Sequence, residues 1–552
     1  MCLPEAFGEA LIFTMKRNLF LLFVLLAFVS CQQDGNSPDP NAKKVLISKV
    51  TVSPTWDSIV VSFGQNAELD IQKLDAQKIS LTPADNFDYD ATVRGSDLIL
   101  ALKHPLNYYT SYTFLFREGY NLGVRVMDDF SHKFTTSYDP NPKYPVISDE
   151  ELLTQVQART FRYFYDFAHP TCGLARERNT SGDIVTTGGS GFGLMAFPVA
   201  VERGFISRAD ALAHCTKVVD FLYDKAERFH GAYPHWLNGK TGKTQAFSTK
   251  DDGADLVETA FLIEGLLTLR QYFSGASAEE TELRDKITAI WEGVEWTWFQ
   301  KDGKNVLYWH WSPNYEWAMN MPIRGWNEAM IIYVLAASSP THSIDKAVYT
   351  EGWAKNGNIR NGKKYYDIVL PLGEEMGGPL FFAHYSFLGL DPMHLSDEYA
   401  NYGEQNTAHA RINYAYSLGH RAQPADPSQA HWGLTASDIP NGYHATSPTS
   451  DNGTTAPTAA LASMPYTPEE SLAAMRYFYY TLGDRLWGEY GFKDAFNLDA
   501  RWFASSYIAI DQGPIICMIE NYRSGLLWNL FMSCPEIQAG LQKLDITYTP
   551  TL

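Results

Sequence analysis

Three acidic side chains repeat at helical spacing in the segment 248–267. Asp251, Asp255 and Glu258 stand at i, i+4 and i+7, so a helix would place all three on one face. Like charges at this spacing repel by about a few tenths of a kcal/mol on an exposed helix, and by more when they are buried. Such a stripe, beside apolar neighbours, indicates a polar ligand or a shared proton. For Asp251 the alternative is helix capping, because Ser248 stands three residues before it.

A further acid, Glu328, follows a run of aromatic residues. It stands two residues after Trp326 and directly precedes the apolar stretch 329–337, which predicts a helix. A carboxyl group beside an indole ring can be desolvated, and desolvation raises its pKa toward the value that a general acid needs near neutral pH. The alternative is an ordinary acid in the first turn of a helix.

Asp511 is the third acidic candidate. It stands three residues before Pro514, in a segment that follows Trp502 and is rich in aromatic residues. Proline suits the first turn of a helix, so this spacing predicts a helix from about residue 514 with Asp511 at its mouth. Asp511 would there either cap the helix or face a cavity.

Acids on separate segments, accompanied by Trp and Tyr, are typical of glycoside hydrolysis. One carboxylic acid protonates the leaving oxygen, and a second carboxylate activates water or attacks the sugar. Aromatic faces stack on the apolar faces of pyranose rings, and carboxylates accept hydrogen bonds from sugar hydroxyls. The aromatic loop 308–326 is the main candidate for such a platform. Arg178, His235 and Tyr385 in other loops are weaker candidates, because each stands alone.

Three stretches, 248–267, 322–336 and 502–528, resemble the glycoamylase domain of bacterial glycoside hydrolases. That group includes the endo-β-1,2-glucanase family (glycoside hydrolase family 144) of Bacteroidetes. The resemblance covers roughly residues 145–545. It implies an (α/α)6 toroid and an inverting hydrolase of a glucan oligosaccharide or polysaccharide, with an endo-β-1,2-glucanase as the first expectation, and with no metal and no other cofactor.

The resemblance also implies roles for the site residues. Glu328 is expected to be the general acid, and Asp511 the base side, acting through waters or a substrate hydroxyl. Glu258 is a third catalytic candidate that would bind sugar hydroxyls and tune the acid together with Asp251 and Asp255. The remaining residues expected to contact substrate are Trp236, Trp309, Trp311, Tyr315, Arg324, Trp326 and Trp502.

Other functions remain open at this stage. The enzyme could be a glucoamylase-like exo-glucosidase of another linkage, or the chain could be a non-catalytic surface lipoprotein that binds glycans. A polysaccharide lyase fits less well, because a pocket of acids repels a uronate substrate. The run 251–255 also matches the D-D-x-x-D motif of isoprenoid synthases, but that chemistry needs a cytosolic diphosphate, and an export signal precedes the body of the chain.

The sequence predicts two domains, of which the second contains all of these candidate residues. Residues 45–138 show short alternating segments separated by turn residues, which predicts an immunoglobulin-like β-sandwich. A Pro-rich linker spans 139–147, and a helical glycoside hydrolase domain is expected over 148–552. Its predicted helices are 150–167, 207–228, 254–272, 280–299, 326–337, 391–418, 468–482 and 514–531. The Gly-rich segment 186–193 is interpreted as a loop without the ending of a phosphate-binding loop.

The N-terminus indicates export. Met15 is the expected start of translation. A basic n-region and an apolar run follow it and lead to Cys31. Residues 1–31 are therefore expected to be an upstream extension plus a lipoprotein signal peptide, with Cys31 lipidated, and 32–44 a tether. We expect a chain anchored by its lipid in the bacterial envelope, facing the periplasm or on the cell surface.

Composition limits the partners. Asp and Glu number 63 against 44 Lys and Arg, a formal net charge of −19. Such a balance argues against nucleic acid and against membrane binding other than through the lipid. Aromatic residues make up 14% of the chain and must serve both core and platform. We expect a monomer. Cys172, Cys215, Cys517 and Cys534 lack metal-knuckle spacing and could be disulfide-bonded or buried as thiols.

Overall fold

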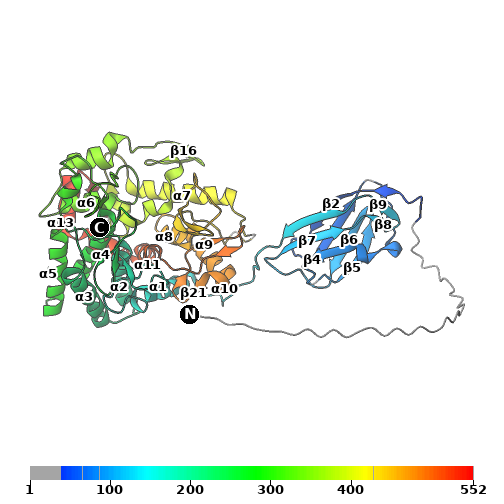
Figure 1. The fold of residues 1–552 in the computed structure, drawn as a ribbon, viewed down its shortest axis with the longest axis horizontal. Coiled ribbons are helices and arrows are strands. Elements are labelled where there is room, and N and C mark those ends of the chain that lie inside the picture. Colours follow the sequence, from blue (N-terminus) through cyan, green and yellow to red (C-terminus); the bar gives the residue numbers. More distant parts are fainter. Residues whose placement is uncertain (1–38, 65, 86, 425, 427, 551–552) are drawn as a thin grey trace, which may run out of the picture. The chain divides into compact units, whose positions relative to one another are not determined.

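The computed structural model describes residues 39–550 apart from 65, 86, 425 and 427. Its chain parts into two compact units between Asp139 and Pro140, a β unit and a helical unit (Figure 1). The predicted signal peptide, Cys31 and the first part of the predicted tether lie outside the described residues. Among the described helices, none combines the length and apolar character needed to cross a membrane.

The β unit contains two antiparallel sheets that share one core. The first has the strand order β2-β3-β6-β5 and the second β10-β7-β4, while a smaller sheet has the order β1-β9-β8. Along β3, Ile59 and Val61 are fully buried and alternate with partly exposed residues. They belong to the same buried cluster as Phe114 and Phe116 of β7. This period-2 burial is what a strand with one covered face requires. The strand bounds are β1 Lys44–Val45, β2 Ile47–Val52, β3 Ser58–Phe63, β4 Ile79–Thr82, β5 Tyr89–Arg94, β6 Asp97–Leu102, β7 Ser111–Phe116, β8 Gly119–Asn121, β9 Val124–Val126 and β10 Phe130–Thr135.

The second unit is mainly helical, with short strands between the helices (Figure 1). Its helices are α1 Asp149–Tyr165, α2 Thr187–Glu202, α3 Arg208–Asp224, α4 Leu256–Tyr272, α5 Ala278–Glu292, α6 Met330–Ser338, α7 Tyr402–His420, α8 Pro457–Ala462, α9 Pro468–Arg476, α10 Gly483–Leu486, α11 Ala509–Ser524, α12 Leu526–Met532 and α13 Pro535–Lys543. The most extensive contacts between helices are those of α2 with α4 and with α11. Helices α2, α4 and α11 are buried along most of their length, as core elements are.

Helix α2 replaces the loop predicted for the Gly-rich segment 186–193. Its glycines let α2 and α4 approach backbone to backbone: a Cβ on Gly191 would lie 2.2 Å from the Phe261 carbonyl oxygen, and one on Gly265 would lie 2.2 Å from the Gly191 carbonyl oxygen. Glycine normally weakens a helix, so the segment reads as a loop until the neighbouring helix is known.

Several predicted helix ends were wrong by up to a few turns. Helix α6 begins at Met330, so Glu328 lies before the helix. Helix α7 begins at Tyr402, capped by the Asn401 side chain. Helix α11 begins at Ala509 and contains Pro514, so Asp511 lies in its first turn.

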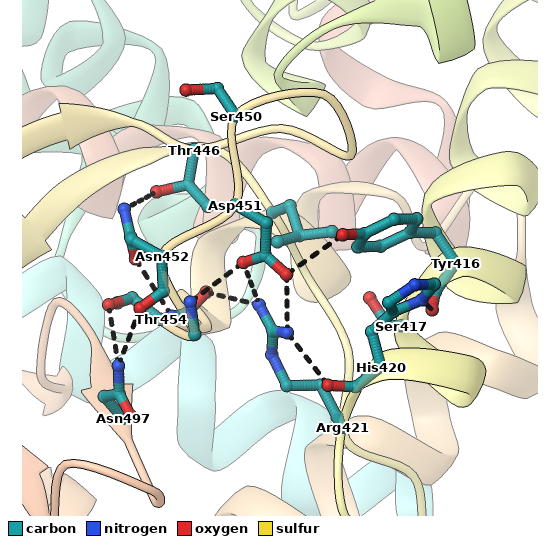
Figure 2. Close-up of polar contacts among 12 residues, drawn as sticks. Tyr416, Ser417, His420, Arg421, Thr446, Ser450, Asp451, Asn452, Thr454 and Asn497 are labelled. Carbon is teal, nitrogen blue, oxygen red and sulfur yellow. Dashed lines mark hydrogen bonds and ion pairs between the residues drawn. The ribbon is translucent and has the colours of Figure 1, made fainter.

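A hairpin of β19 (Ala436–Ile439) and β20 (Gly442–Ala445) is held by the loop that follows it. Figure 2 shows the Asp451 carboxylate of that loop between Arg421, which follows α7, and Tyr416 of α7. Arg421 makes two hydrogen bonds to Asp451, and its side chain is only 4% exposed. The Asn497 side chain donates to the Asn452 carbonyl in the same loop. This ion pair fixes the loop that follows the hairpin, and Ala436, Tyr443 and Ala445 of the hairpin line the cavity described below.

The four described cysteines, Cys172, Cys215, Cys517 and Cys534, are buried free thiols. Within the described residues, therefore, packing and hydrogen bonds hold the fold rather than disulfides.

Candidate active site

A cavity of about 430 Å³ opens among the loops and helix ends of the helical unit. Its wall carries three carboxylates, of which Glu258 and Glu328 are predicted catalytic residues, together with several aromatic rings. The other lining residues are Glu177, Arg178, Thr186, His235, Trp236, Phe247, Val257, Phe261, Trp309, Phe381, Tyr385, Ala436, Tyr443, Ala445, Ile508 and Ile510.

Glu258 reaches the cavity from the first turn of α4. Its Oε2 accepts a hydrogen bond of 2.7 Å from the Gly188 amide, at the N-terminus of α2. Its Oε1 lies 3.9 Å from His235 Nε2. Burial raises the pKa of Glu258 and the nearby Asp255 adds to the rise, while His235 and the Gly188 amide oppose it.

Asp255 supports this arrangement from behind the wall. Its Oδ1 caps α4 by accepting from the Val257 and Glu258 amides, both at 3.0 Å. Its Oδ2 accepts from His235 Nδ1 at 3.0 Å. Burial disfavours the Asp255 carboxylate, but the His235 hydrogen bond and the charge of His310 outweigh it and lower the pKa. Burial disfavours the His235 imidazolium too, yet Glu258 and Asp255 raise the pKa of His235 to about 9.

The prediction that Asp251, Asp255 and Glu258 share one helix face was wrong, because α4 begins at Leu256 and Asp251 lies in the turn before it. Asp251 Oδ2 lies 3.5 Å from His310 Nε2, and the Asp251 side chain is nearly fully buried. Burial and the neighbouring Asp255 raise the pKa of Asp251 to about 7. Asp251 and Asp255 are not among the lining residues, so of the three acids in the stripe only Glu258 meets the cavity.

His235, Asp251 and Asp255 each offer one ligand atom within 4.8 Å of the others, a spacing that could hold a metal ion. The fit to a metal is poor, because His235 Nδ1 already donates to Asp255 and its raised pKa keeps the ring protonated. A protonated imidazole cannot coordinate a metal. An imidazolium between carboxylates accounts for the cluster.

Glu328 lies between the loop after Trp326 and helix α6, and its side chain is partly buried. Ser386 donates a hydrogen bond to the Glu328 carbonyl, and Asn327 accepts one from the Ala329 amide, so the backbone on both sides is fixed. Burial, with smaller contributions from Asp255 and Glu258, raises the pKa of Glu328 to about 7. A carboxylic acid that stays protonated to neutral pH can donate a proton to a leaving group.

Asp511 lies behind the cavity wall and is separated from the cavity by the Tyr385 hydroxyl. It is 1% exposed, and Tyr385, which lines the cavity, donates to its Oδ1 at 3.4 Å. The carboxyl group of Asp494 is close enough to affect the pKa of Asp511. Burial and Asp494 raise the pKa of Asp511 well above its usual range. Burial raises the pKa of Tyr385 well above its usual range, and the charges of Asp511, Glu328 and Glu258 add to the rise.

The predicted substrate contacts fall into two groups. Trp236 and Trp309 line the cavity. The others are not among its lining residues: Trp311 packs on His230 and Trp298, Tyr315 is 45% exposed, Arg324 is exposed, Trp326 is buried against Phe387, and Trp502 lies on the short strand β24 (Trp502–Phe503).

Other site residues had no pattern that marked them in the sequence. Asp438 pairs with Arg178 at 3.1 Å and accepts from Ser506, and its amide donates to Asp494. Phe247 lies in a loop and Tyr443 in β20, and no motif marks either residue. The signal available for these residues was only their type, polar or aromatic, in segments between helices.

Comparison with known proteins identifies the helical unit. The Glycoamylase family model, described as "Putative glucoamylase", matches residues 320–535. The endo-β-1,2-glucanase from Chitinophaga pinensis, solved with sophorotriose and glucose, is 50% identical; the match covers 73% of this chain and 99% of that one, with a TM-score of 0.70. The chain belongs to the glycoamylase-domain glycoside hydrolases of family 144. The family resemblance seen in the sequence is thus confirmed.

Two further relatives of this glycoamylase-domain protein come from Parabacteroides distasonis. A β-1,2-glucanase structure is 39% identical, with a TM-score of 0.69, and the match covers 92% of this chain and 73% of that one. A curated exo β-1,2-glucooligosaccharide sophorohydrolase (non-reducing end) is 47% identical over 426 residues. The match covers 73% of this chain, and the chain spans 58% of the length of that relative.

Proposed function

We propose that this protein hydrolyses β-1,2-glucosidic bonds with inversion at the anomeric carbon. The observation that carries the proposal is Glu328, a cavity-lining carboxylic acid whose pKa is raised to about 7. Relatives at 47% and 50% identity bear the names of β-1,2-glucan hydrolases, which supports the same substrate class here.

In the proposed reaction, Glu328 donates its proton to the glycosidic oxygen as that oxygen leaves the anomeric carbon. A water molecule attacks the opposite face of the sugar, and its proton passes toward Asp511. Because the Tyr385 hydroxyl lies between Asp511 and the cavity, the proton reaches Asp511 through this hydroxyl or an equivalent chain of hydroxyl groups. Such indirect transfer suits an inverting enzyme, whose two carboxyl groups must leave room for water.

The cavity wall supports binding of a neutral sugar. Trp236, Phe247, Trp309 and Tyr443 offer ring faces for pyranose stacking. Glu258 and His235 offer an acceptor and a charged donor for hydroxyl groups. Asp251 and Asp255 would act indirectly, by holding His235 and His310 in place.

We further propose exo action that releases sophorose from the non-reducing end, in place of the endo action expected from the sequence. The β-1,2-glucanase from Parabacteroides distasonis matches both units of this chain, and the curated exo enzyme comes from the same species. Endo action remains the second candidate, because the 50% identical Chitinophaga enzyme is an endo-β-1,2-glucanase. A cavity of about 430 Å³ lies in the lower half of the range usual for small-molecule sites, which supports a short bound segment over a long one.

Product size over time separates these modes. Digestion of a linear β-1,2-glucan should give only disaccharide from the first minutes, with slow loss of polymer length. An early ladder of intermediate oligosaccharides would replace the exo proposal with endo action. Absence of cleavage, with tight binding of the glucan, would favour a glycan-binding lipoprotein.

The arrangement of the helices and the location of the protein also belong to this proposal. Helices α2, α4 and α11 pack as neighbours, which supports closure of an (α/α)6 toroid around the cavity. A lipid on Cys31 would hold the enzyme in the bacterial envelope. Incorporation of labelled fatty acid that is lost in Cys31→Ala tests the anchor.

A further inference from the structure

Two buried carboxyl groups lie beside each other behind the Tyr385 wall. Asp494 follows β22 (Gly491–Phe492) and is 2% exposed, while Asp511 in the first turn of α11 is 1% exposed. The two groups are close enough to affect each other's pKa as hydrogen-bonding partners. One oxygen of each, Asp494 Oδ1 and Asp511 Oδ2, is buried and has no hydrogen-bond donor.

Two carboxylates cannot form this contact without a proton. An ionised carboxylate can only accept hydrogen bonds, so two of them offer no donor to each other. Ionising both groups side by side in a buried site would also cost much free energy, because the two negative charges repel. A single proton between them removes both problems. It satisfies the two otherwise unpartnered oxygens and leaves the pair with one negative charge.

The surroundings favour one charge on the pair rather than none. The Asp438 amide donates to Asp494 Oδ2 at 2.6 Å, and the Tyr385 hydroxyl donates to Asp511 Oδ1 at 3.4 Å. Arg178 lies nearby, paired with Asp438 and Glu177. Asp438 and Tyr443 are the other titratable groups that face the pair. Two donors to the outer oxygens stabilise an anion that can shift between the two groups.

We propose that Asp494 is a positioning residue that shares one proton with Asp511, so that the two carboxyl groups serve as a single base. When the proton lies on Asp494, its O–H donates to Asp511 and Asp511 is the free acceptor. The proton released as water attacks the sugar then adds to Asp511, which makes the pair neutral, while Glu328 has lost its proton to the leaving oxygen. Proton exchange with solvent restores both. The role of the pair in catalysis rests on the proposed function; the shared proton does not.

Two substitutions of similar size distinguish a role of Asp494 in positioning the Asp511 proton from a purely structural role. In Asp494→Asn the amide can accept from Asp438 and donate to Asp511, as protonated Asp494 does. This variant should keep kcat within about threefold of wild type, with no upward shift in the acid limb of kcat/KM. Asp494→Leu cannot donate; it should lose on the order of 10²-fold in kcat with little change in KM, and its acid limb should move to higher pH.

A second readout does not depend on activity. Infrared spectra at neutral pH should contain the C=O band of a buried protonated carboxyl that is lost in Asp494→Asn, because Asp511 is then ionised. Glu264→Gln is the matched control: Glu264 is fully buried in α4, its pKa is raised well above the usual range by burial, and it lies outside the cavity wall. This control should lose its own band and keep wild-type kinetics.

The proposal is overturned if Asp494→Asn keeps the carboxyl band, or if its activity falls as far as that of Asp494→Leu while both variants retain the wild-type circular dichroism. It is also overturned if the acid limb of Asp494→Leu is unmoved. A wild-type protein that shows the band but cleaves no glucan would instead refute the proposed function and leave the shared proton standing.

Discussion

Glu258 and Glu328 line one cavity, and Asp511 lies behind a tyrosine of its wall. The chain has 63 acidic residues. Burial raises the pKa of Glu258, Glu328 and Asp511, and this distinguishes them from acids at the surface. Among the three, Glu328 has the value best suited to a general acid, about 7.

Replacement of the general acid tests this assignment. Glu328→Gln should lower kcat on a β-1,2-glucan by about 10²–10⁴-fold, because the amide cannot supply the proton. An aryl glycoside whose phenol leaves without protonation should be cleaved at a much smaller loss. Steady-state kinetics on both substrates measure the difference. Glu264→Gln is the control, and a Glu328→Gln enzyme equally impaired on both substrates would assign Glu328 another role.

The same residue should affect stability in a pH-dependent way. Its pKa is about 7 in the folded protein against a usual value of 4.5, so the folded state holds a proton that the unfolded state loses between these pH values. Stability is therefore lost as pH rises from about 4.5 to 7. Allowing for partial exposure, the cost above pH 7 is on the order of 2 kcal/mol.

Glu328→Gln should remove this cost. The variant should unfold at a higher temperature than wild type at pH 8 and at the same temperature near pH 4. Calorimetry at the two pH values measures it, and an equal shift at both would show that ionisation of Glu328 is not the cause.

Local spacing was enough to find some of these residues. The i, i+4, i+7 stripe singled out Glu258, and aromatic neighbours singled out Glu328 and Asp511. Asp438 and Asp494 could not be found, because each is isolated in its own segment and becomes significant only when folding brings it to Asp511. Trp326 has the residue type for a sugar platform, but the approach of Phe387 makes it part of the core.

Among the elements, the packing of α2 against α4 determines the site. It places the α2 N-terminus, with the Gly188 amide, directly on the Glu258 carboxylate. Small residues are required where the two backbones meet, because a Cβ at Gly191 or at Gly265 would lie 2.2 Å from a backbone carbonyl oxygen of the other helix.

Gly191→Ala tests this close approach. The added methyl would lie 2.2 Å from the Phe261 carbonyl oxygen, so the helices must separate, at a cost of about 3 kcal/mol. Denaturant unfolding should show the loss. Gly419→Ala in α7 is the control, because nothing lies within 4 Å of its Cβ position, and it should be neutral or slightly stabilising. Equal stability of the two variants would contradict the packing argument.

Helix α2 also shows where prediction from sequence stops. The amphipathic sequence pattern of α1 or α3 predicts a helix with one buried face. Helix α2 is buried on nearly all sides and rich in glycine, so it has neither the pattern nor the propensity. Its helical state is imposed by its neighbours, as is the start of α11 ahead of Pro514.

At the scale of the molecule, a β unit precedes a helical unit of the glycoamylase-domain family. The change from period-2 to period-3.6 patterning near residue 140 could be predicted, because it depends only on local burial. The substrate could not be derived from burial or spacing. It rests on the family and on the cavity, which is acidic, aromatic and suited to a neutral sugar.

The most direct test of β-1,2-specific inverting hydrolysis is proton NMR of the first products from β-1,2-glucooligosaccharides, recorded before mutarotation, beside β-1,3-, β-1,4- and α-1,4-glucans. The account predicts cleavage of the β-1,2 substrate alone, with the α-anomer of sophorose as the first signal. A β-anomer as first product, or faster cleavage of another linkage, would contradict it.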